Sequence, residues 1–284
     1  MIEYGPTGYP VGPFVIFFEK YESGWMPFNI DRYKYFLDTQ FLGKTLHYRE
    51  TTNSTMDDAR SILDSDQNIA SGFICVAGEQ LSGRGRLGRS WISNPDSGLY
   101  STFYIKTVIG ENAPLITIAA ALAVAEAVKS TTNVDLNFKW PNDVMYEEKK
   151  VSGILAEAYT DSNDLKILLG IGINREWAED IPSEIARIAI SLSEIAGFAP
   201  STEKLLANLT NALEPKILAI SQSPESIVHE WSGKLTTIGR EITLNTINGS
   251  IDGRATGVNE TGDLILLLDN GQYRNISAGD VVLR

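Results

Sequence analysis

The chain has 284 residues, of which 43% are hydrophobic and 21% are charged, and its formal net charge is −12. This composition is typical of a globular protein with a core large enough to need no disulfide or metal staple. The negative charge disfavours binding to nucleic acid or to an anionic membrane, because such binding needs a broadly basic face. We therefore expect no DNA partner and no membrane partner.

The chain has one cysteine, Cys75, which lies in the apolar run 72–77. We expect a buried strand residue and not a reactive thiol, which suits a reducing compartment and a cytoplasmic location. No segment approaches the roughly 20 consecutive apolar residues needed to cross a bilayer. Residues 1–13 are rich in Gly, Pro and Tyr and do not resemble a secretory signal.

Hydrophobic periodicity predicts strands and helices in alternation along most of the chain. After an aromatic lead-in, expected to pack on the main domain, a short helix is predicted at 31–37. A strand at 46–49 precedes a helix at 55–63, which Ser54 or Asn53 could cap. Further strands are predicted at 73–77, 99–105, 136–140, 151–159 and 165–172. Further helices are predicted at 113–130, 202–220 and 224–231.

The tail after residue 239 has short apolar runs separated by turn sequences. The turn signals are Asn248-Gly249, Glu260-Thr261-Gly262 and Asp269-Asn270-Gly271. This spacing predicts a small β module, so the fold class is α+β.

The most distinctive local pattern is a loop of alternating glycines and arginines, Gly83-Arg84-Gly85-Arg86-Leu87-Gly88-Arg89. Glycines let the backbone wrap closely around a ligand, and arginines match phosphate or carboxylate oxygens. Three interpretations stay open for this loop alone: a loop that closes over a small anion, a solvated flexible loop, or an RNA-binding Gly/Arg segment.

A second pattern is Lys139-Trp140-Pro141-Asn142-Asp143, followed by a strand that starts at Lys150. It predicts a hairpin whose mouth carries two lysines and a carboxylate. A lysine there can stabilise charge that builds on a carboxylate and an α-phosphate, and Asp143 could steer magnesium or orient a lysine. The alternative is a surface hairpin with exposed charges.

Weaker signals surround these two. Gly170 and Gly172 leave room at a strand end, and Asn174 follows them with a donor and an acceptor; simple strand packing is the alternative. The hydroxyl residues at 51–55 precede a helix, and helix capping is the alternative explanation for one or two of them. The amide of Gln80, before the arginine loop, could hold a urea-like or carboxyl group.

Taken together and in this order, these motifs resemble the biotin protein ligase (holocarboxylase synthetase) family, in its monofunctional type. The resemblance runs from about residue 42 to the end, and the lead-in around Phe28 and Leu42 is more similar to the eukaryotic branch. It implies a catalytic domain like that of class II synthetases, a mixed sheet with flanking helices, at 43–234. It also implies an SH3-like barrel at 235–284, after a lead-in at 1–42.

The resemblance implies a role for each matched position. Biotin would be bound by Ser54, Thr55, Gln80, Gly83, Arg84, Lys150, Gly153, Gly170 and Gly172. ATP and the adenylate would be bound by Arg84, Arg86, Leu87, Gly88, Arg89, Trp91, Lys139, Asn142, Asp143 and Asn174. Lys150, Arg84 and Asp143 would be catalytic, and Asp143 with Asn174 would hold magnesium. Met56 departs from the family's Ser-Thr-Asn pattern and leaves the register of that motif open, with Asn53 as the alternative.

The implied reaction forms biotinyl-5′-AMP from biotin and ATP and transfers biotin to a lysine of biotin-dependent carboxylases or their carrier domains. A lipoate ligase-like enzyme and a non-catalytic biotin sensor are the alternatives. Replacing Arg84 by Gly is expected to release the intermediate. The lead-in is too short and wrongly patterned for a helix-turn-helix, so repression is not expected. The expected assembly is a monomer or a homodimer.

Overall fold

The computed structural model describes residues 28–66, 69–107, 112–161, 164–177, 181–246 and 249–283, and three short strands before them. These strands are β1 (Glu3–Tyr4), β2 (Pro10–Val11) and β3 (Val15–Phe18). The rest of the aromatic lead-in before Phe28 lies outside the described residues. From Phe28 onward the lead-in is buried against α6, and it contains the predicted short helix as α1 (Ile30–Phe36).

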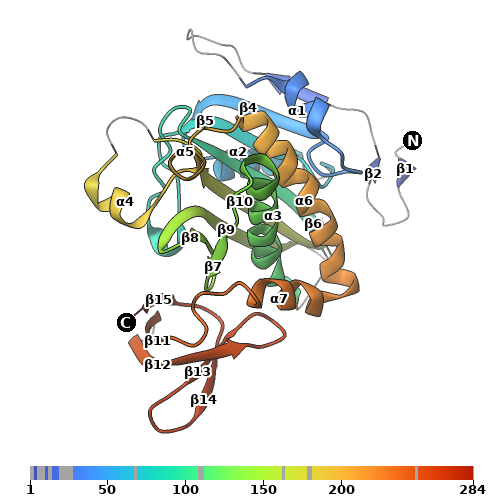
Figure 1. Ribbon diagram of the computed structural model, residues 1–284. Coiled ribbons are helices and arrows are strands. Elements are labelled where there is room, and N and C mark those ends of the chain that lie inside the picture. Colours follow the sequence, from blue (N-terminus) through green and yellow to red (C-terminus); the bar gives the residue numbers. More distant parts are fainter. Residues whose placement is uncertain are drawn as a thin grey trace.

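The main domain is built on an eight-stranded mixed sheet in the order β3-β4-β5-β6-β10-β9-β8-β7 (Figure 1). The strands after β3 are β4 (Thr45–Thr52), β5 (Ile74–Gln80), β6 (Gly98–Thr107), β7 (Asn137–Lys139), β8 (Asp143–Tyr146), β9 (Lys149–Asp161) and β10 (Asp164–Asn174). β3, β4 and β5 are parallel to each other, and every later pair is antiparallel.

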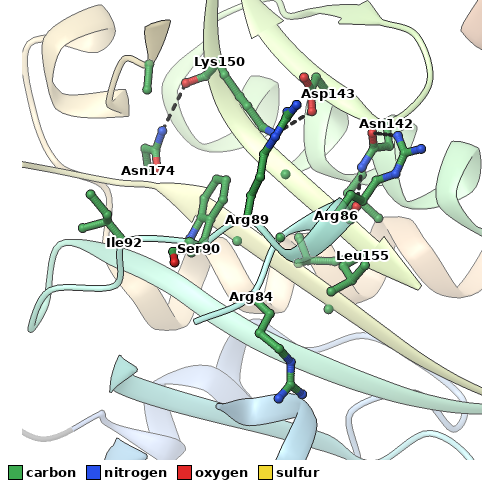
Figure 2. Close-up of a pocket in the computed structure, with 18 of the residues that line it drawn as sticks. Arg84, Arg86, Arg89, Ser90, Ile92, Asn142, Asp143, Lys150, Leu155 and Asn174 are labelled. Atoms are coloured by element: carbon green, nitrogen blue, oxygen red, sulfur yellow. Dashed lines mark hydrogen bonds and ion pairs between the residues drawn. The ribbon is translucent and has the colours of Figure 1, made fainter. Parts of the chain in front are cut away.

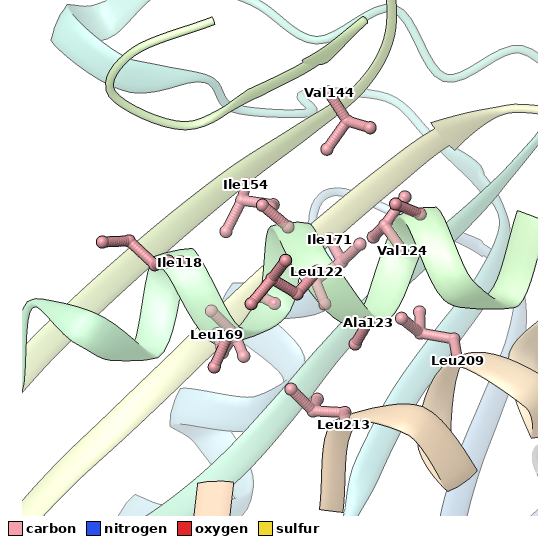
Figure 3. Packing of buried hydrophobic residues seen from close by; sticks show 14 of the residues in the cluster. Ile118, Leu122, Ala123, Val124, Val144, Ile154, Leu169, Ile171, Leu209 and Leu213 are labelled. Carbon is pink, nitrogen blue, oxygen red and sulfur yellow. The ribbon is translucent and has the colours of Figure 1, made fainter. Parts of the chain in front are cut away.

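Helices cover both faces of this sheet. α2 (Thr55–Ser65) covers one face, and α3 (Leu115–Thr132) and α6 (Thr202–Gln222) cover the other. The remaining helices are α4 (Ser183–Ile188), α5 (Leu192–Ala196) and α7 (Pro224–Ser232), and α7 packs on α3 and α6. Side chains alternate between the faces. Leu169 and Ile171 of β10 join the large core under α3 and α6 (Figure 3), whereas Leu168 joins a smaller core under α2. This two-sided burial confirms the α+β class.

Within the described residues, α3 is the helix that is long and apolar enough, by length and composition, to cross a membrane. The expectation that no segment approaches that limit was therefore too strict. Of this helix, 67% is buried inside the protein, between the sheet and the helices α6 and α7. Packing in the core of the protein therefore explains the apolar surface of α3.

A buried carboxylate ties the lead-in to α6. Glu214, only 5% exposed, accepts hydrogen bonds from the backbone N–H groups of Gln40, Phe41 and Leu42 at 2.6, 2.9 and 2.8 Å. Three charge-assisted bonds stabilise a carboxylate that would otherwise be costly to bury.

The C-terminal module is a five-stranded antiparallel sheet, in the order β14-β13-β12-β11-β15, consistent with a small SH3-like domain. Its strands are β11 (Glu241–Thr246), β12 (Gly249–Val258), β13 (Leu264–Leu267), β14 (Tyr273–Ile276) and β15 (Asp280–Leu283). The predicted turns at Gly262 and Gly271 are confirmed, and both glycines have a φ of +81°. Asn248 lies outside the described residues.

The module is anchored to the main domain through Trp140. The backbone N–H of this residue donates to Thr237 Oγ1, and its indole N–H donates to the Gly262 carbonyl, both at 3.0 Å. The C-terminal module therefore meets the main domain at the turn after β7.

Three parts of the sequence prediction differ from the structure. The strands β3 and β8 and the short helices α4 and α5 were not predicted, because segments of four to six residues carry little periodicity. The predicted single hairpin from Lys139 to Lys150 is wrong, since β8 lies between them and pairs with both β7 and β9. Ser54 stands at the N-cap of α2, but its side chain makes no capping hydrogen bond.

Candidate active site

A cavity of about 650 Å³ opens over the sheet beyond the N-terminus of α2. It is lined by the start of α2, the arginine loop, the β7–β8 turn, parts of β9 and β10, α4 and the C-terminal module. Along β10, the residues whose side chains face the α2 side are first Leu168, which packs under the helix, and then Gly170, Gly172 and Asn174, which line the cavity. The loss of side chains past the helix hollows the sheet surface at this place.

The floor of the cavity is a pair of opposed glycines covered by an indole. Gly153 of β9 lies across from Gly172 of β10, and Trp91 rests on both. A Cβ at Gly172 would come within 2.6 Å of the indole, and one at Gly153 within 2.7 Å. The Trp91 Nε1 atom is buried and has no hydrogen-bond partner. The indole, which lines the cavity, therefore offers a flat apolar wall to a small organic ligand.

The inner end of the cavity is a polar network around Gln80. Its Oε1 accepts from the Thr55 backbone N–H at 3.0 Å and from Thr55 Oγ1 at 3.1 Å, while its Nε2 donates to Ser93 Oγ at 2.8 Å. Ser54 and Thr55 both line the cavity, and Met56 packs on the Gly170 backbone. The structure thus places Ser54 and Thr55, and not Asn53, at the cavity wall.

An ion pair forms part of the cavity lining. Lys150 Nζ lies 2.5 Å from Asp143 Oδ1 and 5.5 Å from the centroid of the Trp91 ring (Figure 2). The two side chains come from the adjacent antiparallel strands β9 and β8, and both are partly exposed to the cavity, at 30% and 26%. An ammonium held at a fixed point in a cavity can stabilise developing negative charge.

Asn142 and Asn174 frame this ion pair. Asn142 Nδ2 donates to the Ile154 carbonyl at 2.5 Å, and Asn174 Nδ2 donates to the Lys150 carbonyl at 3.1 Å. In Figure 2 the amide oxygen of Asn174 lies on the side away from Lys150. Each amide is therefore held by a backbone carbonyl, which fixes its orientation.

The three arginines of the loop bind three different walls. Arg84 forms two hydrogen bonds with Asp57 of α2, at 2.8 and 2.7 Å, and its guanidinium points away from the other loop arginines in Figure 2. Arg86 donates to Asn142 Oδ1 at 2.8 Å, and Arg89 pairs with Asp280 of β15. Burial lowers the pKa of Arg86, opposed by the charges of Asp280 and Asp143. Arg86, not Arg84, is thus the loop arginine that reaches the β7–β8 turn.

Some predicted site residues do not line the cavity. Gly83 is packed beneath Ser93 and Trp91, and Leu87 is 62% exposed at the tip of the loop with a φ of +55°. Gly88 follows it with a φ of +72° and open space around its Cα. These three residues shape the loop, and its arginines and Trp91 provide the lining.

The structure adds cavity residues that the sequence prediction missed. Trp177, Ile185 and Ile188 form an apolar flank, and Tyr100 and Asp280 contribute further polar groups. The apolar flank was missed because its segment shows little hydrophobic periodicity. Asp280 was missed because it belongs to the C-terminal module, and no local sequence pattern predicts how that module docks.

The donor groups allow a magnesium ion that arrives with a nucleotide. Asp143 supplies a carboxylate and Asn174 an amide oxygen, and magnesium often takes one or two protein carboxylates together with substrate phosphates and water. No cluster of three or more His, Cys, Asp or Glu residues suited to a metal occurs among the described residues. This sparse set fits magnesium held mainly by its nucleotide.

Comparison with known proteins agrees with this geometry. Residues 48–174 match the Biotin/lipoate A/B protein ligase family, and residues 237–284 match the Biotin protein ligase C terminal domain. The chain is 28% identical over 253 residues to the Bifunctional ligase/repressor BirA of Bacillus spizizenii, covering 87% of this chain and 76% of that protein. It is 30% identical over 229 residues to the protein of the same name from Salmonella typhimurium, covering 78% of this chain and 70% of that protein.

A solved structure gives the same result. The biotin protein ligase from Aquifex aeolicus, in complex with biotin and ATP, superposes with a TM-score of 0.74 at 31% identity, over 84% of this chain and 98% of that one. The chain belongs to the biotin protein ligase family and is a ligase enzyme.

Proposed function

We propose that this chain forms biotinyl-5′-AMP from biotin and ATP, and then transfers biotin to a lysine of biotin-dependent carboxylases or their carrier domains. The observation that carries the proposal is the position of Lys150. Its ammonium lies between Asp143 and the Trp91 ring, in the cavity that the Gln80 network and the loop arginines also line. A carboxylate and an α-phosphate brought together there would share one cation.

The inner end of the cavity suits the ring system of biotin. The hydroxyls of Ser54 and Thr55, with the Gln80 amide behind them, offer donors and acceptors to a ureido group. The Trp91 indole, which packs on Gly153 and Gly172, offers an apolar wall to the chain that leads to the carboxylate. Gly170 keeps the wall open beside Met56, and the backbone around Gly83 and Arg84 closes the edge.

The outer end of the cavity suits the nucleotide. Arg86 and Lys139 line this end beside Asn142, and Arg89 lies at the wall that the C-terminal module forms. The apolar flank of Trp177, Ile185 and Ile188 offers a surface for a base. Asp143 and Asn174 would contact magnesium on the phosphates, and Leu87 and Gly88 would form the turn that covers them.

The chemistry needs no covalent enzyme intermediate. A carboxylate oxygen of biotin attacks the α-phosphorus of ATP, the bond to the β-phosphate oxygen breaks, and pyrophosphate leaves. Lys150 and Arg86 stabilise the added charge, and the walls exclude water, so catalysis rests on positioning and electrostatics. The acceptor lysine then attacks the mixed anhydride, releasing AMP. A cytoplasmic location is supported by the free and buried thiol of Cys75.

The first experiment measures pyrophosphate release with magnesium-ATP and either biotin or lipoate, followed by labelling of a biotin carrier domain. Biotin-dependent release and lysine labelling are expected. Turnover with lipoate alone would overturn the choice of substrate and favour a lipoate ligase-like enzyme. Binding of biotin without pyrophosphate release would instead identify a non-catalytic sensor.

A further inference from the structure

The C-terminal module contributes one acidic side chain to the wall of the cavity. Asp280, the first residue of β15, pairs with Arg89, which lies 191 positions earlier in the chain. Its side chain is 19% exposed, whereas that of Arg89 is 69% exposed. The carboxylate is thus the more buried partner of the pair, and the arginine is largely exposed.

The position of Asp280 is set by the sheet of the C-terminal module and by the attachment of that module to the main domain. β15 pairs with β11, where Asp280 lies opposite Asn245, another cavity residue. The same module is held to the main domain by the hydrogen bonds of Trp140 to Thr237 and Gly262. Trp140 directly precedes the turn that carries Asn142 and Asp143. The module therefore presents Asp280 at a defined place relative to the catalytic turn.

Asp280 acts on the loop at two points. It pairs with Arg89 directly, and its charge also favours the cationic form of Arg86, which donates to Asn142. Arg84 is held at the other end of the loop by Asp57. The loop between the two carboxylates spans the cavity from α2 to the C-terminal module, with Arg86 in between. Of these ties, only the one to Asp280 joins the loop to the C-terminal module in the described residues.

We infer that Asp280 is a positioning residue of the adenylation reaction: by holding Arg89, it keeps the arginine loop across the cavity and so retains the reactive adenylate until an acceptor arrives. The inference rests on the proposed function. It assigns the C-terminal module a role in the reaction itself. An exposed ion pair contributes little to folding stability and exchanges readily, so it can restrain the loop without locking it.

The test compares Asp280→Asn with Asp269→Asn, which removes a charge from an exposed turn of the same module. For each variant, the adenylate found free in solution is divided by the pyrophosphate formed. Asp280→Asn is expected to raise this fraction about fivefold, the size of effect that an ion pair of this kind can have. Asp269→Asn is expected to leave it unchanged, and Asp280→Glu to restore much of the retention.

Charge exchange separates positioning from a general structural effect. Arg89→Asp alone should leak adenylate, and Arg89→Asp combined with Asp280→Arg should leak less than either single variant. The KM for biotin should stay close to that of the parent throughout, because the Gln80 end of the cavity is untouched. Equal leakage from the Asp280→Asn and Asp269→Asn proteins would overturn the inference.

A second readout does not depend on turnover. Hydrogen–deuterium exchange of the backbone at 83–91 in the ligand-free protein should be faster in Asp280→Asn than in the parent, and unchanged in Asp269→Asn. If the parent makes no pyrophosphate with biotin, the proposed function fails. The hydrogen–deuterium exchange would still show whether the Arg89–Asp280 ion pair restrains the loop. If exchange of the loop is equal in all three proteins, Asp280 does not position it.

Discussion

Trp91 and Gly172 are in direct contact across the candidate site, with no room for a Cβ between the indole and the β10 backbone. The contact joins the end of the arginine loop to the centre of the sheet. Because Gly153 makes the same contact from β9, the two glycines set how far the indole stands from the sheet, and so how far it reaches into the cavity. A larger side chain at either glycine should therefore weaken ligand binding more than it lowers the stability of the fold.

We predict that Gly172→Ala raises the KM for biotin in the pyrophosphate assay by about tenfold or more, because the new methyl group pushes Trp91 away from the sheet and into the cavity. The matched control is Gly257→Ala in β12, where a Cβ would meet nothing closer than 4.0 Å. Equal KM values for the two variants would show that Trp91 does not bound the part of the cavity that biotin occupies.

We predict that Lys150→Gln lowers the rate of adenylate formation by about 10²- to 10³-fold, as expected when one fixed donor to a transition state is removed. Lys129→Gln is the control, because Lys129 is exposed and pairs with Asp135 far from the cavity. Calorimetric titration should show that biotin binding weakens much less than the rate falls. A rate close to that of the parent would remove Lys150 from the chemistry.

The two arginines Arg84 and Arg86 should have separable effects. Arg86→Ala removes the link to Asn142 and should slow adenylate formation, whereas Arg84→Ala removes only the tie to Asp57. We predict a rate loss of about tenfold or more for Arg86→Ala and a smaller one for Arg84→Ala. Single-turnover pyrophosphate release measures both, and a larger loss for Arg84→Ala would support Arg84 as the catalytic arginine that the sequence analysis expects.

Burial raises the pKa of the Cys75 thiol, so the thiol stays protonated well above neutral pH. An ordinary cysteine has a pKa of about 8.5 and gains thiolate steeply between pH 7 and 9. We predict that iodoacetamide does not label the folded protein anywhere in that range, and that labelling becomes rapid in denaturant. Labelling of the folded protein that rises with pH would show an accessible thiol.

Glu214→Ala should lower the free energy of unfolding by about 3 kcal/mol, because three buried backbone N–H groups lose their acceptor. Glu230→Ala, an exposed position on α7, should change it by about 0.5 kcal/mol or less. Urea unfolding followed by tryptophan fluorescence compares the two. A similar midpoint for both variants would mean that the loop at 40–42 is held by other contacts.

Much of the fold was predictable because its elements are long and strongly patterned. The helix at 113–130 and the strands at 99–105 and 165–172 correspond to α3, β6 and β10. Their apolar spacing follows the geometry of a helix or a strand and needs no tertiary information. The short elements α4, α5 and β8 depend instead on contacts with neighbours, and were missed.

For the candidate site, the sequence by itself determined which segments carry chemistry and in which order they occur. Only the tertiary structure decided how their side chains pair: Arg84 with Asp57, Arg86 with Asn142, and Arg89 with Asp280. Glycine turns and alternating apolar residues determine structure over a few neighbouring positions, so they can be recognised in the sequence. An ion pair between residues 191 positions apart exists only after two independently patterned modules have docked, and no local rule encodes that geometry.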